Sequence, residues 1–309
     1  MDCPPVSVII TTYYRDEHLR RAIERVLDQN YQNIELIVVD DSGEEYAKEI
    51  VAEYNSAEYI PHSTNQGQIA GWNTGMDRAS GKYIQFHDDD DWLFKDKIQK
   101  QVRFLEDNST IGSVYCGIVD DEGTERLPPE NNRGNVVEPT LRHQLYRCQT
   151  TTMLTRRNLL DEVFPLKTYP AATDIVLQLE LCTQTEFDYI DEPLVHRSID
   201  DDGIGSSVVN RRTRIQLVRD YGSIYDEYPE IRAETLARSH KMLGETVLQE
   251  HVWSLAAIVA FAKANYFLPK KTIDSIHYLL IFLASIFGRP GLSGYSVLRP
   301  YLTQIKNKL

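Results

Sequence analysis

The sequence has few cysteines, few basic residues and no long hydrophobic run. Its four cysteines are scattered without a C-x-x-C pair, which argues against a disulfide framework or zinc site and favours a reducing, cytosolic compartment. With 33 Lys and Arg against 46 Asp and Glu, the net charge is −13. We therefore expect no nucleic-acid partner, because binding to phosphates needs a basic face. The first residues lack the basic and apolar segments of a secretory signal, so we expect none.

What the sequence has is the composition of a soluble globular protein. Of its 309 residues, 42% are hydrophobic and 26% are charged. This length suits one large domain, or one domain with an appendage.

The C-terminal part differs from the rest in charge. Residues 263–309 hold seven basic residues and one acidic residue. Within this part, residues 276–287 are almost wholly apolar, but a helix that crosses a bilayer needs about 20 such residues. A buried core helix and an interfacial helix both remain open, as does dimer formation. The flanking Lys270, Lys271 and Arg289 favour the interfacial helix, and with it peripheral contact with an anionic membrane.

The first hundred residues alternate between strand and helix patterns. Apolar runs predict strands at 6–11, 34–39, 59–61 and 82–87, and helical spacing predicts helices at 17–29, 45–54 and 65–79. This alternation predicts a parallel, doubly wound α/β sheet. Further on we expect a helix at 95–105, strands at 113–119, 150–154 and 187–195, a helix at 173–182, and only helices beyond 211.

Polar residues follow three of these strands, at 11–13, 40–41 and 88–91. In doubly wound sheets, ligands bind outside the carboxyl ends of the strands. The run of four aspartates contains a D-x-D pair, Asp88 and Asp90, whose carboxylates are suited to a hard divalent cation such as Mg²⁺ or Mn²⁺. A solvated acidic turn is the alternative interpretation.

Four segments together carry a resemblance to a known family. They are residues 8–13 (VIITTY), 29–42 (QNYQNIELIVVDDS), 65–75 with its Asn-Gln-Gly and Asn-Thr-Gly, and 88–92 (DDDDW). In this order and spacing they resemble the inverting family 2 glycosyltransferases, and are similar to archaeal and bacterial enzymes of surface-glycan synthesis and protein N-glycosylation. The resemblance implies a GT-A domain, a Rossmann-like nucleotide-diphospho-sugar transferase fold, at residues 1–210. Residues 211–309 would form a C-terminal helical extension.

The resemblance also implies roles for single residues. Thr11 and Tyr13 would flank the nucleobase, and Asp40, beside Asp41, would accept a hydrogen bond from uracil N3–H. The cation would be held by Asp90 and Asp88, and Asp174 at a helix start would be the catalytic base. The remaining donor-binding residues would be Asn65, Gly67, Asn73 and Asp89. Two positions depart from the family pattern, with Trp72 where an arginine is common and Thr173 where a glutamate is usual.

The function that follows is metal-dependent transfer of a sugar, with a hexuronic acid as one candidate, from a UDP-sugar to a hydroxyl of a growing glycan. The acceptor would be lipid-linked, at the cytoplasmic face of the membrane. One alternative is a sugar nucleotidyltransferase, but residues 11–15 lack the glycine-rich loop that would cradle a triphosphate. The other is a non-catalytic module that binds nucleotide sugars, in which loss of an acidic site residue would be expected.

Overall fold

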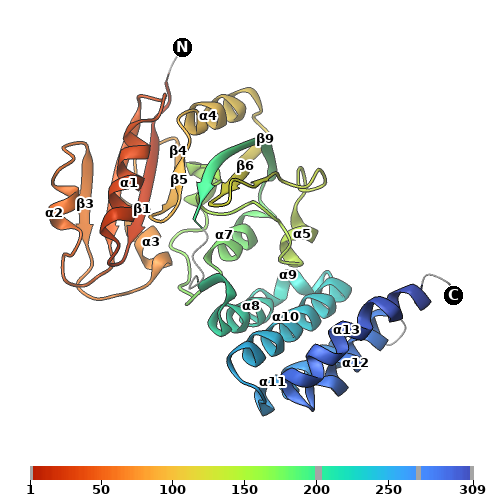
Figure 1. Cartoon of the computed structure of the whole chain (residues 1–309). Coiled ribbons are helices and arrows are strands. Elements are labelled where there is room, and N and C mark those ends of the chain that lie inside the picture. Colours follow the sequence, from red (N-terminus) through yellow and green to blue (C-terminus); the bar gives the residue numbers. More distant parts are fainter. Residues whose placement is uncertain (1–2, 199–203, 269–272, 307–309) are drawn as a thin grey trace. The chain divides into compact units, whose positions relative to one another are not determined.

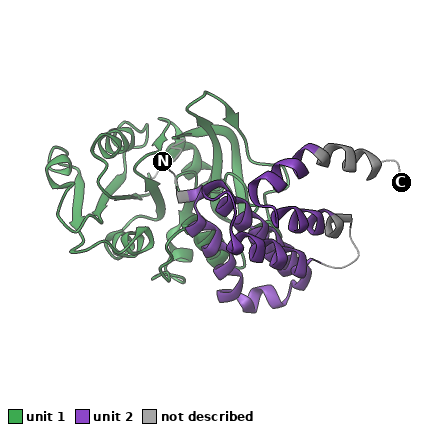
Figure 2. Ribbon diagram, turned by 60° about the horizontal axis from the view of Figure 1, so that its bottom comes forward, with its two compact units in different colours: residues 1–140, 144–201 green, residues 141–143, 202–309 purple. Residues whose placement is uncertain are grey.

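The computed structural model describes residues 3–198, 204–268 and 273–306 (Figure 1). The chain divides into two units, shown in Figure 2. Unit 1 consists of residues 1–140 and 144–201, and unit 2 of residues 141–143 and 202–309.

Unit 1 is built on a mixed sheet with the strand order β3-β2-β1-β4-β8-β6-β9-β5, and β7 pairs with β6. Its parallel half consists of β1 (Val6–Thr12), β2 (Ile34–Asp40), β3 (Ala57–Pro61) and β4 (Tyr83–Asp88). The other strands are β5 (Trp92–Leu93), β6 (Ile111–Asp120), β7 (Glu125–Arg126), β8 (Leu154–Arg156) and β9 (Glu186–Arg197). β8 is antiparallel to both β4 and β6, and β6 then pairs with β9 in parallel.

Helices cover both faces of the parallel half. On one face, α1 (Asp16–Leu27) buries Leu19, Ile23 and Val26 in a core cluster that includes alternate residues of β1. On the other face lies α3 (Gln68–Arg78), where a Cβ added to Gly75 would lie 2.4 Å from Ile9 Cγ2. Because α3 approaches β1 so closely, only glycine fits at this position. The doubly wound arrangement predicted from the sequence is therefore present.

Two predicted elements differ from the structure. The helix expected at 45–54 is only α2 (Lys48–Val51), because the backbone turns at Glu45 with a φ of 55°. The strand expected at 150–154 begins only with β8 at Leu154. Before it, the Thr152 hydroxyl donates to the carbonyls of Arg147 and Gln149, so a turn replaces an extended run of β-branched residues.

Two other helices of unit 1, α4 (Lys97–Asp107) and α7 (Thr173–Leu181), match the helices predicted at 95–105 and 173–182. The short helices α5 (Val137–Leu141) and α6 (Arg157–Leu160) were not predicted.

Unit 2 is helical, as predicted for residues beyond 211. After a 3₁₀ turn at Ile204–Ser206 it contains α8 (Val208–Asp220), α9 (Gly222–Asp226), α10 (Pro229–Glu250), α11 (Leu255–Phe267), α12 (Ile273–Ser285) and α13 (Gly288–Lys306). Its core cluster joins α10, α11 and α12 through Leu248, Phe261 and Ile281. Within the described part of the chain, no helix is both long enough and apolar enough to cross a membrane.

Candidate active site

The register of the parallel strands aligns three of the predicted positions at one edge of the sheet. Thr12 of β1 lies opposite Asp40 of β2, and Thr11 lies opposite Asp88 of β4. Since neighbouring strands are about 4.8 Å apart, Asp40 and Asp88 lie roughly 10 Å from each other on either side of β1. The predicted nucleoside and metal residues thus share one edge.

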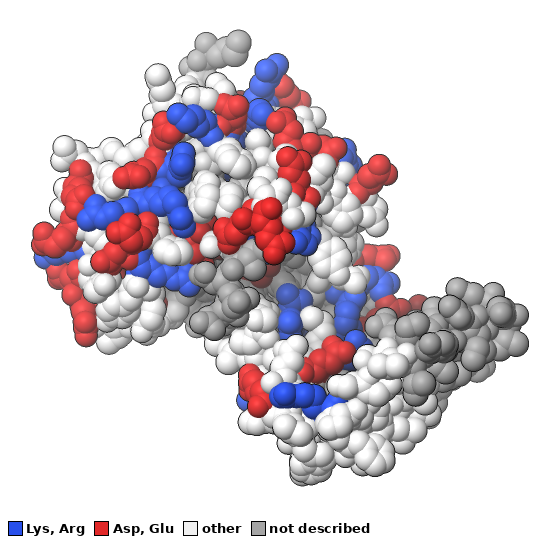
Figure 3. Space-filling view, in the orientation of Figure 1, with Lys and Arg blue, Asp and Glu red and all other residues white. Residues whose placement is uncertain are grey.

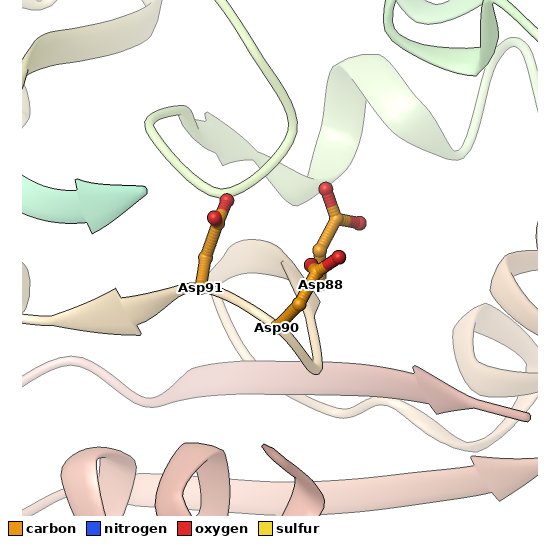
Figure 4. Close-up of side chains that lie close together, drawn as sticks. All are labelled: Asp88, Asp90 and Asp91. Carbon is orange, nitrogen blue, oxygen red and sulfur yellow. The ribbon is translucent and has the colours of Figure 1, made fainter. Parts of the chain in front are cut away.

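Three aspartates converge at the end of β4. One carboxylate oxygen from each of Asp88, Asp90 and Asp91 lies within 4.8 Å of the others. In Figure 4 the three side chains project from the end of β4 and the turn that leads to β5. The structure thus brings together the predicted pair, Asp88 and Asp90, and adds Asp91. We name these three residues the aspartate cluster.

The electrostatics of the aspartate cluster favour a cation. Burial, and secondarily the charge of Asp90, raise the pKa of Asp88 to about 7. Burial and the neighbouring carboxylates also hold the pKa of Asp91 well above its ordinary value. Asp88 and Asp91 retain protons to a higher pH because the negative charge of the cluster is poorly compensated. Hard divalent cations prefer carboxylate oxygens as ligands. The donor set therefore fits a Mg²⁺ or Mn²⁺ ion.

Asp88 is also fixed by neighbours from two other segments. Its Oδ1 accepts a hydrogen bond from the Gln68 amide at 2.6 Å, and its Oδ2 accepts one from the Thr150 hydroxyl at 3.0 Å. Its backbone N–H donates to Thr151 Oγ1 at 3.2 Å. The turn at 150–153 that replaced the predicted strand thus positions a residue of the aspartate cluster.

Asp89 lies outside the aspartate cluster. Its carboxylate accepts hydrogen bonds from the Thr12 hydroxyl at 2.7 Å and from the Arg15 guanidinium at 3.2 Å. Burial raises the pKa of Asp89 to about 6 despite these partners. Asp89 thus connects the end of β1 to the acidic turn at 88–91 through hydrogen bonds. Thr12 and Asp91 were marked only as members of the polar runs at 11–13 and 88–91, and no pattern in the sequence marked Arg15.

Asp40 is 1% exposed and holds the turn that follows β2. Its carboxylate accepts hydrogen bonds from the N–H groups of Ser42 (2.9 Å) and Ala47 (2.8 Å) and from the Tyr59 hydroxyl (2.8 Å). Burial alone would raise the pKa of Asp40, but these bonds outweigh it and hold the pKa below its ordinary value. The Ser42 side chain is a further partner, so the acceptor positions of this buried carboxylate are largely used within the turn.

Asp41 organises the next loop. Its carboxylate accepts hydrogen bonds from the N–H groups of Gln66 (2.8 Å) and Gly67 (2.7 Å) and lies 2.7 Å from His62 Nδ1. Gly67 has a φ of 87°, a conformation that favours glycine, and α3 begins directly after it. Asn65 is exposed in the same loop. The predicted Asn-Gln-Gly segment is therefore anchored to the turn after β2.

Asn73 and Trp72 point into the protein. The Asn73 side chain exchanges two hydrogen bonds with the backbone of Leu166, at 2.8 and 2.9 Å. Trp72 is fully buried, with its ring centroid 4.9 Å from that of Phe86. A donor contact through Asn73 would need these bonds to break.

The loop after β1 carries exposed aromatic rings. Tyr13 is 51% exposed and meets Tyr14 edge-on at 4.7 Å, and Tyr14 meets Tyr46 in the same way at 4.7 Å. Thr11, by contrast, is buried against α3, where a Cβ at Gly71 would lie 2.6 Å from its methyl group. Tyr13 thus offers a free ring face for a base, whereas Thr11 acts mainly in packing.

Asp174 lies in the first turn of α7, and a short chain of hydrogen bonds connects that turn to the aspartate cluster. The hydroxyl of Thr173 donates to Gln68 Oε1 at 2.7 Å, and the same glutamine donates to Asp88. The structure therefore brings the start of α7 close to Asp88, although Asp174 is 84 residues away from Asp90 along the chain.

Comparison with known proteins agrees with this geometry. The sequence model of the family described as "Glycosyl transferase family 2" matches residues 7–164, just over half of the chain. The match includes the turn after β2, the loop before α3 and the aspartate cluster, and it ends before Asp174.

Relatives and solved structures point the same way. The putative teichuronic acid biosynthesis glycosyltransferase TuaG of Bacillus subtilis is 33% identical over 110 residues, which are 34% of this chain and 44% of that protein. Matches to eight curated relatives cover 17% to 46% of their lengths, so the chain spans less than half of each.

Two solved structures share the fold. One is the mannosyltransferase PcManGT of Pyrobaculum calidifontis in complex with GDP-Man and Mn²⁺, with a TM-score of 0.58, 16% identity, and coverage of 97% of this chain and 85% of that one. The other is S. aureus TarS 1-349 in complex with UDP-GlcNAc, with a TM-score of 0.58, 14% identity, and coverage of 93% and 88%. The predicted α/β fold with C-terminal helices is confirmed.

Proposed function

The chain belongs to glycosyl transferase family 2, as its motifs predicted, and from this premise we propose that it transfers a sugar from a UDP-sugar to a hydroxyl of a glycan, with inversion. The observation that carries the proposal is the convergence of three carboxylates within 4.8 Å at the strand edge that also bears Asp40. Residues 1–210 would be the catalytic domain and residues 211–309 its helical extension.

The aspartate cluster would hold the donor's diphosphate through a divalent cation. Asp90 and Asp88 would be ligands, as expected from the sequence, and Asp91 is a third candidate because its carboxylate faces the same point. A Mn²⁺ or Mg²⁺ ion bound there would neutralise the charge that builds up on the departing nucleoside diphosphate. The structure of PcManGT in complex with GDP-Man and Mn²⁺ supports this choice of ion.

The nucleoside would lie over the ends of β1 and β2. Tyr13 would stack on the base, because its ring is exposed at the loop after β1. Asp40 would accept a hydrogen bond from uracil N3–H, a group that cytosine lacks, in exchange for one of its present partners. The remaining predicted donor-binding residues would support the donor mainly by shaping the surrounding loops. Their polar groups are buried, exposed in a loop, or bonded to the backbone. These residues are Thr11, Asp41, Asn65, Gly67 and Asn73.

Asp174 would be the catalytic base. Its carboxylate would accept the proton of the acceptor hydroxyl while that oxygen forms a bond to the anomeric carbon. The bond from that carbon to the diphosphate oxygen breaks, and its electron pair leaves with UDP. Attack on the side opposite the leaving group inverts the configuration, which requires a base that faces the donor across the sugar.

The acceptor would be a glycan under construction on a lipid carrier at the cytoplasmic face of the cell membrane, and a hexuronic acid is one candidate for the donated sugar. The relative named for teichuronic acid biosynthesis supports a cell-surface polymer as the product class.

Exposed aromatic residues in unit 2 support contact with a membrane. Trp253 is 57% and Phe287 74% exposed, and the Trp253 indole donates a hydrogen bond to the Ile286 carbonyl at 3.0 Å. On the face shown in Figure 3, unit 2 has broad areas without charged side chains, whereas acidic and basic side chains are interspersed over unit 1. Aromatic residues are favoured at membrane interfaces. The flanking Lys270 and Lys271 lie outside the described residues.

Sedimentation with vesicles tests this membrane contact. The full chain should sediment with vesicles rich in anionic lipid, and the double substitution Trp253→Ser and Phe287→Ser should reduce the bound fraction. If the substituted chain binds equally, these residues do not form the contact. A concentration-dependent change in mass without lipid would instead favour a dimer.

Transfer itself is tested by incubation with labelled UDP-sugars, Mn²⁺ and a lipid extract. Product should form with the wild-type chain and be lost in Asp90→Ala and in Asp174→Ala. Asp107→Asn, a change in an exposed aspartate of α4, is the matched control and should leave transfer unchanged. Binding of a UDP-sugar without any turnover would favour a non-catalytic module, and release of pyrophosphate from UTP and a sugar phosphate would favour a nucleotidyltransferase.

A further inference from the structure

Arg15, in the loop between β1 and α1, already occupies part of the surroundings in which a cation would bind. Its Nη1 lies 2.5 Å from Oδ2 of Asp90 and 3.2 Å from Oδ1 of Asp89. Asp89 is held in place by the Thr12 hydroxyl on its other oxygen, at 2.7 Å. One guanidinium nitrogen therefore bridges a fixed carboxylate and a member of the aspartate cluster.

The two carboxylates that contact Arg15 differ in how easily each contact can be broken. The Asp89 side chain is 8% exposed and has a buried hydroxyl partner, whereas that of Asp90 is 28% exposed, and among its described contacts Arg15 is the one hydrogen bond. The Arg15 side chain is itself 42% exposed, so it has solvent to move into. The contact with Asp90 is the one that can be broken at little cost to packing.

Arg15 and a divalent cation would compete for Asp90. A cation coordinated by Asp88, Asp90 and Asp91 would lie about 2 Å from the Asp90 carboxylate. That ion and the guanidinium would then be like charges only a few ångströms apart, with reduced screening. When the cation takes Oδ2 of Asp90, the oxygen that Arg15 contacts, the guanidinium must move away from Asp90.

We propose that Arg15 is an internal counter-ion of the aspartate cluster: it neutralises Asp90 before the cation binds and is displaced by the cation. Arg15 then keeps its bond to Asp89 and presents its remaining N–H groups to the donor's diphosphate. A guanidinium is well suited to this second task because it binds phosphate oxygens with two parallel hydrogen bonds. The proposal rests on the proposed function, since it assumes that a cation and a diphosphate bind here.

The displacement of Arg15 from Asp90 would couple the binding of the cation to the binding of the donor. Without the donor, the cation must replace Arg15 at Asp90 and binds more weakly than the three carboxylates alone would allow. With the donor present, the displaced guanidinium gains a new anionic partner, so the cation and the diphosphate strengthen each other's binding. Reciprocal coupling of this kind is a thermodynamic necessity once the two ligands bias the same side chain.

The alternative is an ordinary surface ion pair, which contributes little and couples nothing. Titration of the full chain with Mn²⁺ alone, followed by electron paramagnetic resonance, distinguishes the two. With Arg15→Gln we expect Mn²⁺ to bind about threefold to tenfold more tightly than in the wild type, because a competing charge is gone. With saturating Mn²⁺, UDP should bind about tenfold or more weakly to the same variant, because a charge-assisted hydrogen bond to phosphate is lost.

Two variants complete the design. Arg20→Gln is the matched control, since Arg20 is a nearby arginine, in α1, that pairs with Glu53 outside the site; it should change neither affinity. Arg15→Lys should keep the competition with Mn²⁺ but lose part of the UDP affinity. Thermal melting confirms that each variant is folded.

The outcomes separate this proposal from the one it rests on. If Mn²⁺ affinity in Arg15→Gln is unchanged or weaker while the wild type binds Mn²⁺ and UDP, Arg15 is not a competing counter-ion and only this inference fails. If Mn²⁺ binding tightens but UDP binding is unchanged, the step in which Arg15 contacts the diphosphate is refuted. If the wild type binds no Mn²⁺ at all, the cation site and the Arg15 proposal both fail.

Discussion

The substitution Asp40→Asn measures how much one carboxylate stabilises the nucleoside end of the site. Asp40 is 1% exposed and accepts three hydrogen bonds, from the N–H groups of Ser42 and Ala47 and from the Tyr59 hydroxyl. A hydrogen bond to a charged group contributes about 1.5–3 kcal/mol. The asparagine keeps one acceptor oxygen but directs an NH₂ group at a donor, so we expect a loss of about 3–5 kcal/mol in the free energy of unfolding.

The pH dependence of that loss follows from the lowered pKa of Asp40. Stability supplied by an acid with a lowered folded-state pKa is fully present above the unfolded value and disappears as the pH falls through the folded value. Urea unfolding of the wild type and the asparagine variant should therefore differ most at pH 7, and the two curves should converge as the pH falls below about 4.

Tyr59→Phe serves as the control for Asp40. It removes one of the three donors and leaves the carboxylate charged, so it should cost about 1–2 kcal/mol of stability while UDP affinity stays within about twofold. Asp40→Asn should lose both stability and UDP affinity. A stability loss below about 1 kcal/mol in the asparagine variant, or one that does not change with pH, would refute this interpretation of the turn.

Three further predictions concern the rest of the site and its support. The raised pKa values of Asp88 and Asp89 mean that the folded chain keeps protons that the unfolded chain has released, so metal-free protein should lose stability as the pH rises from 5 to 8. Urea unfolding in EDTA should show this decline, and added Mn²⁺ should remove it; a flat profile in EDTA would contradict the charge argument. Gly75→Ala should destabilise by about 1–3 kcal/mol, because its Cβ would overlap Ile9, and no loss in urea unfolding would mean that α3 can move away from β1. Tyr13→Ala should weaken UDP binding about tenfold by calorimetry, whereas Tyr13→Phe should not; equal losses would rule out stacking.

The parallel half of the fold could be predicted because local patterns and tertiary packing agree there. Buried strands read as continuous apolar runs, and α1 has its apolar residues at helical spacing, so four strands and two long helices are recognisable. Predictions were wrong where side chains override local propensity. At 45–54, the Asp40 carboxylate binds the Ala47 N–H and delays the helix, and at 150–153, threonine hydroxyls bond to the backbone in place of a ladder.

The candidate site, like the fold, could be predicted from the sequence only in part. The D-x-D pair and the Asp40-Asp41 turn were identified because the family pattern marks them, and the structure places them on one strand edge. No local pattern connects Arg15 with the acidic run, because Arg15 lies 73 positions before Asp88 and an arginine before a helix is common. Such partners are set by how the loops pack, which a single sequence does not encode in its local pattern.

The central claim is that the aspartate cluster binds the donor through a cation. Isothermal titration of UDP into the full chain tests it most directly, with Mn²⁺ in one cell and EDTA in the other, for the wild type and for Asp90→Asn. We predict that UDP binds the wild type with Mn²⁺, that EDTA removes most of the affinity, and that the variant shows no gain from Mn²⁺. Equal UDP affinity in Mn²⁺ and in EDTA would contradict the claim.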